Sequence, residues 1–148
     1  MGRMSSRRSC RPAGEPLESR ALLATFQVVN IYATGAGSLN RSIQLANKKP
    51  GADTITFNIP GTRNRDFPVV GFVGTTVKRK VTIDGHTQPG SARNTSADPA
   101  VNNAKITLKN IGPFGPALAF VGQGASGSLL RGVRVVSDSH SQSGIEIR

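Results

Sequence analysis

The hydrophobic period of this chain changes abruptly after the dipeptide Pro50-Gly51, and this switch constrains the fold more than any other feature. Before the switch, the apolar residues of segment 38–47 recur at i, i+4 and i+7, which predicts one short amphipathic helix with Ser38 as its N-cap. The apolar face of this helix is formed by Leu39, Ile43 and Ala46. From Asp53 onward, apolar and polar residues alternate, which predicts short strands.

The predicted strands are too short for ordinary hairpins, because each spans only about three to five residues before a Gly, Asn, Asp or Ser. One more strand precedes the helix in segment 25–32, with Phe26 and Val28 on one side and Ile31 as a third candidate. Short strands joined by short corners can wind into a coil whose successive turns stack in parallel about 4.8 Å apart. The expected inward positions are Ile55, Phe57, Ile59, Val81, Ile83, Ile106, Leu108, Leu118, Phe120, Leu129 or Leu130, Val133, Val135, Ile145 and Ile147.

A repeat supports this coil. Residues 117–120 align with residues 144–147 at an offset of 27 (144 minus 117). Segment 129–135 supplies the strands that form the other sides of the coil between them. Solenoid repeats commonly fall between roughly 20 and 50 residues. A β-sandwich also offers short strands with turn signals, so the repeat alone leaves that alternative open.

The amino-acid composition limits the classes of protein to which this chain can belong. The 148 residues suit one domain, with an aliphatic core because the chain has no Trp and only 5% aromatic residues. Its 17 Gly and 9 Pro indicate a turn-rich architecture. No apolar run approaches the roughly 18 residues that a membrane helix needs, so we expect no transmembrane segment. Cys10 is alone, which excludes an intrachain disulfide and a thiolate metal cluster.

The formal net charge of +11 is spread along the chain, with one dense point at Lys78, Arg79 and Lys80. Lys48 and Lys49 suit the negative end of the predicted helix dipole. Diffuse basicity attracts polyanions such as nucleic acid, acidic polysaccharide or an envelope polymer. The three-residue cluster is therefore the candidate polyanion contact, against the alternative of a solvated edge ahead of the next strand. It lacks aromatic partners for base stacking, which argues against a specific nucleic-acid site.

Residues 1–24 form a separate basic leader rich in Arg, Ser and Pro. A secretory signal needs a positive region followed by about 7–15 apolar residues. The apolar stretch at residues 21–24 is shorter than that, so we interpret the leader as an atypical export or sorting segment, or as the product of a misplaced start codon.

Two long motifs resemble a known family. The segments PGADTITFNIPG at 50–61, preceded by GAGSL at 35–39, and VTIDGHTQPG at 81–90 are similar to the opening of bacterial surface proteins with a right-handed parallel β-helix. Segment 127–145 resembles the first regular coils of that group. Residues 17–24 are similar to a leader on large exported proteins of some bacteria.

The resemblance covers residues 17–148 and implies a pectin-lyase-like superhelix, secretion or surface display, and a longer protein. The fold class that we predict is mostly β: a right-handed parallel β-helix with one short N-terminal capping helix. Residues 25–148 would be the N-terminal cap and first coils of a truncated β-helix. Two departures from the family are the stop at Arg148 inside a predicted strand, and the absence from residues 62–79 of the compact Leu-Pro turn expected before the Val81 strand.

No motif predicts a cofactor or a metal. Segment 122–127 matches the dinucleotide fingerprint GxGxxG, but that fingerprint needs a helix after its glycines, and here Leu129 and Leu130 open a predicted strand. We therefore interpret it as a loop between strands. His86 and His140 are far apart and lack the spacing of a zinc site.

No catalytic set is visible either. Chemistry on polysaccharides would need paired carboxylates, or an Asp with Arg or Lys partners on adjacent coils. Asp53 and Asp84 occupy turn positions that explain them, and Glu146 should face outward. The run 137–140, with Asp138 beside two serines and His140, lacks triad geometry because its members are sequence neighbours. The acidic residues after the leader are Asp53, Asp66, Asp84, Asp98, Asp138 and Glu146.

Three functions follow from these patterns. The first is a non-catalytic secreted or cell-surface module, structural, adhesive or glycan-contacting, whose partner is an acidic polysaccharide or envelope polymer. The alternative is the N-terminal remnant of a polysaccharide lyase or hydrolase whose catalytic coils are missing. The third, suggested only by the charge, is a nucleic-acid-binding protein. Because the final predicted strand at 143–148 leaves unpaired backbone groups, we also expect self-association through that edge.

Overall fold

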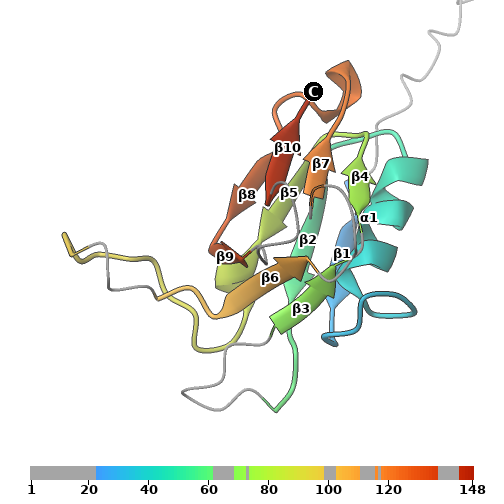
Figure 1. Cartoon of the computed structure of the whole chain (residues 1–148). Coiled ribbons are helices and arrows are strands. Elements are labelled where there is room, and N and C mark those ends of the chain that lie inside the picture. The colour runs from blue at the N-terminus through green and yellow to red at the C-terminus, as the bar shows by residue number, and fades with distance from the viewer. Residues whose placement is uncertain are drawn as a thin grey trace, which may run out of the picture.

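The structure is a computed structural model that describes residues 23–61, 69–72, 74–98, 103–110, 116, 118–136 and 144–148. Most of the predicted leader and segment 62–68 lie outside these ranges. The described elements are one α-helix, two 3₁₀ turns and ten short strands (Figure 1). In chain order they are β1 Thr25–Val28, α1 Leu39–Lys48, β2 Asp53–Phe57, β3 Val69–Phe72, β4 Thr75–Val77, β5 Val81–Asp84, η1 Gly85–Thr87, β6 Ile106–Asn110, β7 Leu118–Phe120, η2 Gln123–Ala125, β8 Leu129–Arg131, β9 Val133–Val136 and β10 Ile145–Ile147.

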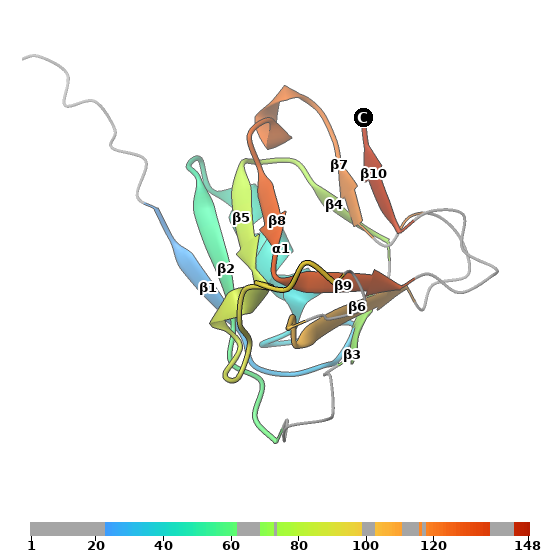
Figure 2. The same cartoon turned by 90° about the vertical axis from the view of Figure 1, so that its left-hand side faces the viewer.

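The strands form three sheets in which every pairing is parallel. Their orders are β1-β2-β5-β8, β3-β6-β9 and β4-β7-β10. From β2 to β10, consecutive strands therefore pass through the three sheets in a repeating order. Figure 2 shows the sheets around a common interior, with α1 behind them. The prediction of a mostly-β chain with parallel strands and one short helix is confirmed at this level.

The register confirms the predicted offset in two places. Ile145 pairs with Leu118, and Val133 pairs with Ile106, so both offsets are 27 residues (145 minus 118, and 133 minus 106). The offset grows to 47 between Thr82 and Leu129, because a long excursion separates β5 from β6. Insertions of this kind make the offset differ from one strand pair to the next, so the predicted value holds only where no long excursion intervenes.

Aliphatic ladders fill the interior. In the first sheet, Phe26 pairs with Ile55, Ile55 with Ile83, and Ile83 with Leu130. Ile55 and Ile83 are fully buried, and each contributes about 1.5–3 kcal/mol by leaving water. Leu130 packs against this core, whereas Leu129 is 44% exposed, which settles the choice that the sequence left open between them.

Helix α1 covers one end of the interior (Figure 1). The Ser38 hydroxyl accepts a hydrogen bond from the Arg41 N–H at 3.2 Å, which confirms the predicted N-cap. The predicted apolar face is buried in the core cluster: Leu39, Ile43 and Ala46. None of the helices in the described ranges is long and apolar enough to cross a bilayer.

Two expectations for strand residues are corrected. The first strand ends at Val28, and Ile31 is 47% exposed instead of facing inward. The chain turns here because the Asn30 side chain accepts from the Tyr32 N–H at 3.2 Å and donates to the Ala36 carbonyl at 2.8 Å. Ile145 and Ile147 lie in register with inward residues of β7, but they remain 41% and 82% exposed.

Candidate functional site

The candidate cluster Lys78–Lys80 forms the corner between β4 and β5. The strand residues on either side, Val77 and Val81, are almost completely buried and fix both ends of the corner. All three charged side chains between them are exposed. The alternation that buries the two valines thus leaves a short, solvent-facing segment that carries three positive charges.

Asn47 fastens this corner to the helix. Its Nδ2 donates to the Thr76 carbonyl at 2.8 Å, and its Oδ1 accepts the Lys78 N–H at 2.8 Å. Both groups would otherwise have to find water or another partner, because they flank the end of a strand. These two bonds, which we call the Asn47 clasp, hold the last turn of α1 next to the corner. That turn includes the exposed Lys48, and the exposed Lys49 follows it.

The resulting group of five cations, which we call the basic cluster, consists of Lys48, Lys49, Lys78, Arg79 and Lys80. None of these side chains forms an ion pair or a hydrogen bond in the described part of the chain. Sequence reasoning assigned the first two lysines to the helix dipole and missed their place in this cluster. No local signal could have found it, since the bonds of Asn47 span 29 and 31 residues.

The GxGxxG segment lies against the corner and has no helix after it. Gly122 to Gly127 contain the 3₁₀ turn η2, and β8 follows. A side chain on Gly124 would collide with the Lys78 carbonyl oxygen, and one on Gly127 would lie 3.3 Å from Cε of Lys80. The glycines therefore allow close backbone approach to the corner. The dinucleotide fingerprint is not supported, because a strand occupies the place of the helix that would face a pyrophosphate.

Asp84 and Arg131 form a second polar group on the neighbouring sheet. The two residues are register partners on β5 and β8, and Arg131 Nη2 lies 2.6 Å from Asp84 Oδ2. The other carboxylate oxygen, Oδ1, accepts the His86 N–H at 3.1 Å. Asp84 thus has the turn role expected from the sequence, as the cap of η1, and an additional cross-strand partner that the sequence analysis missed.

This environment makes Asp84 a poor base. Burial alone would raise the pKa of its carboxyl, but the hydrogen bonds from Arg131 and the His86 N–H outweigh burial and lower the pKa below its ordinary value of 3.8. The carboxylate is therefore charged at neutral pH and engaged through both oxygens. A lowered pKa weakens a carboxylate as a general base, and both oxygens of Asp84 already accept a hydrogen bond from this chain.

The remaining predicted residues do not converge. Asp53 Oδ1 accepts the Ala24 N–H at 2.9 Å at the start of β2, and Glu146 on β10 forms an ion pair with Arg148, which directly follows that strand. His86 packs against Gly132, where a Cβ would lie 2.7 Å from the imidazole Cγ. The other candidates lie outside the described residues: Cys10, Asp66, Ser137, Asp138, Ser139 and His140. Among residues the structure describes, no three His, Cys, Asp or Glu side chains are arranged to hold a metal ion.

Comparisons with protein-family models, with curated proteins and with solved structures return no match.

Proposed function

We propose that the three sheets are the first turns of a right-handed parallel β-helix, closed at one end by α1. Two observations support this proposal: the repeating order in which β2 to β10 visit the sheets, and the offset of 27 residues shared by two strand pairs. Connections between parallel strands are right-handed in almost all proteins, which supports that hand. The resemblance of segments 35–61 and 81–90 to surface β-helix proteins points the same way.

On this framework, the function that we propose is a non-catalytic, secreted or cell-surface module that binds acidic polysaccharide through the basic cluster. The observation that carries the proposal is the Asn47 clasp, which gathers five exposed cations without a neutralising partner from two distant segments. The clasp holds the two backbone segments that carry these charges next to each other. A repeating anionic polymer gains from such an arrangement, because several contacts form without further ordering of the backbone.

Acidic polysaccharide is favoured over nucleic acid by the chemistry of the cluster. Four of its five members are lysines, which bind carboxylate, sulfate or phosphate as point charges. None is aromatic, so the site offers no platform on which bases could stack. A linear polyuronate or sulfated glycan presents charges without bases and therefore fits these groups.

The test compares two variants that lose the same charge. In the site variant, Lys78, Arg79 and Lys80 are all replaced by Gln. In the control, Gln replaces three exposed arginines elsewhere: Arg41, Arg93 and Arg134. Binding of polygalacturonate and of heparin is measured by calorimetry at about 0.15 M ionic strength, where the Debye length is about 8 Å. We expect the site variant to bind about tenfold more weakly, since three exposed charge contacts contribute about 0.5 kcal/mol each.

The control variant should bind within about twofold of the native chain, because only the long-range field changes. Equal losses in the two variants would show that binding follows net charge and not the cluster. Stronger binding to single-stranded nucleic acid than to either glycan would favour the third function over this one.

One observation favours the second candidate function, part of a polysaccharide lyase or hydrolase. Asp84 and Arg131 are an Asp and an Arg on adjacent strands, the arrangement that such chemistry can use. The engagement of both carboxylate oxygens makes this pair the weaker candidate. Release of reducing or unsaturated ends from pectin or alginate by the purified chain, abolished by Asp84→Ala, would establish the enzymatic function instead.

A further inference from the structure

Among the residues that the structure describes, no helix or strand lies over the end of the interior opposite α1. The three sheets end there at β8, β9 and β10, and no described strand pairs with their outer sides (Figure 2). We call this surface the open end. An unpaired strand edge carries N–H and C=O groups that can accept another strand.

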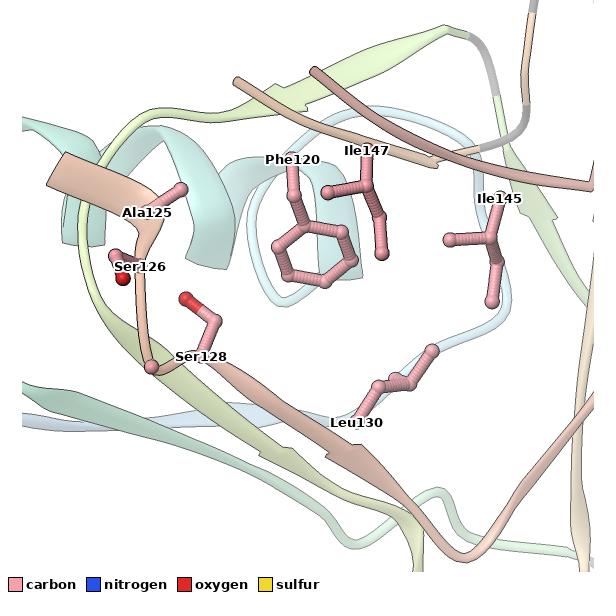
Figure 3. Close-up of a pocket in the computed structure, with 8 residues that line it drawn as sticks. Phe120, Ala125, Ser126, Ser128, Leu130, Ile145 and Ile147 are labelled. Atoms are coloured by element: carbon pink, nitrogen blue, oxygen red, sulfur yellow. The ribbon is translucent and has the colours of Figure 1, made fainter. Parts of the chain in front are cut away.

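A cavity of about 470 Å³ lies at the open end. Figure 3 shows Phe120, Leu130, Ile145 and Ile147 pointing into one shared space. The lining residues are Phe120, Ala125, Ser126, Gly127, Ser128, Leu130, Ile145 and Ile147. Leu118 on β7 is 1% exposed, whereas its register partner on β10, Ile145, is 41% exposed. The ladder that is buried one strand earlier is therefore open to water here.

The hydrogen bonds of β10 show which of its backbone groups are available. Leu118 N–H donates to the Gly144 carbonyl at 3.2 Å, Arg148 N–H donates to the Phe120 carbonyl at 2.9 Å, and the Arg148 carbonyl accepts from Gly122 N–H at 3.0 Å. The even-numbered residues thus bond to β7. By strand alternation, Ile145 and Ile147 direct their N–H and C=O groups to the outer side.

The charges on β10 favour one pairing. If a second β10 lies antiparallel with the two-fold axis at Ile147, the two Ile147 residues face each other and can exchange two hydrogen bonds. Glu146 then lies opposite the partner's Arg148, and Arg148 lies opposite the partner's Glu146. An axis at Ile145 would instead place Glu146 opposite the partner's Gly144, with no charge pairing. Opposite charges directly across an antiparallel pair are stabilising.

We propose that two copies of this chain associate through their open ends, with β10 antiparallel to the partner subunit's β10 and Ile147 on the two-fold axis. The exposed isoleucines of both copies then lie on the same face of the joined sheet, as do all directly opposed side chains. A head-to-tail contact is disfavoured, because α1 covers the other end with exposed polar residues such as Arg41 and Gln44. The open end adjoins the basic cluster at Gly127, which lies beside Lys80, but β10 contributes no residue to that cluster. The proposal therefore does not depend on the proposed function.

Charge exchange tests the register. Sedimentation equilibrium is measured over two decades of concentration for the native chain and for Glu146→Arg and Arg148→Glu. Each variant alone places like charges opposite each other twice in its dimer. We therefore expect each variant to dimerise about tenfold more weakly than the native chain. An equimolar mixture of the two variants restores both opposite pairs, and we expect it to form a heterodimer of near-native affinity.

The mixture separates this contact from the ion pair within one chain, because both variants lose the internal Glu146–Arg148 pair. Ile147→Lys should be monomeric, and its unfolding curve should match that of the native chain because the side chain is mostly exposed. A native chain that is monomeric throughout overturns the proposal. Protection of the Ile147 N–H in that monomer would identify a segment of the same chain as the cover. A mixture no tighter than its components overturns the proposed register.

Discussion

The two ends of the interior differ in how completely their apolar side chains are buried. At the α1 end, Leu39 and Ile43 are fully buried, and the polar groups of the connecting backbone are satisfied by Ser38 and Asn47. At the open end, Ile147 continues a ladder but is 82% exposed. The comparison shows that strand alternation alone does not create a core. Burial requires a further element to lie over the ladder, and here a ten-residue helix performs that role at one end.

The largest effect should distinguish the two ends directly. We expect Ile43→Ala to lower the free energy of unfolding by about 2–5 kcal/mol, because it removes apolar atoms and leaves a cavity beneath the helix. Ile147→Ala should cost less than about 1 kcal/mol in the monomer, since most of that side chain is already in water. Urea unfolding at low protein concentration measures both. Equal losses would contradict the contrast between the ends.

A smaller effect is expected from the clasp between the helix and the basic cluster. Asn47→Ala removes both bonds of the side chain and leaves the Thr76 carbonyl and the Lys78 N–H without this partner, which costs about 1–3 kcal/mol. Asn47→Asp keeps the acceptor for Lys78 but not the donor to Thr76, so it should lose less. Thermal unfolding gives the ranking. Identical stability of the Asn47→Ala and native chains would mean that the clasp does not hold the cap.

The smallest effect concerns the ion pair that ties β8, at the open end, to β5. The pKa of Asp84 is lowered in the folded state, so its contribution is present above the ordinary value of 3.8 and is lost as the pH falls through the folded pKa. The stability difference between the native chain and Asp84→Asn should therefore shrink as the pH falls from about 6 to about 2. Because Arg131 is partly exposed, this contribution is the smallest of the three. A difference that grows in acid would contradict the assignment.

The structural features that could be predicted from the sequence are those set by residues close together along the chain. The helix with its Ser38 cap, the alternation in β2 and the offset of 27 residues all follow from local periods and turn residues. Asn47 and the Asp84–Arg131 pair could not be predicted, because their partners are 29 to 47 residues away and irregular excursions set the register between them. The exposure of Ile147 was also missed, because alternation indicates which way a side chain points and not what covers it.

Residue-resolved amide hydrogen exchange on the Ile147→Lys chain, at low concentration, tests the contrast between the ends most directly. In the monomer, the amides of β2 should exchange slowest, because this strand is paired on both sides. On β10, the amides of Ile145 and of position 147 should exchange fast, whereas Arg148, which donates to Phe120, should be slower. This alternation is the predicted result. Amides at 145 and 147 that are protected as strongly as those of β2 would contradict an open end.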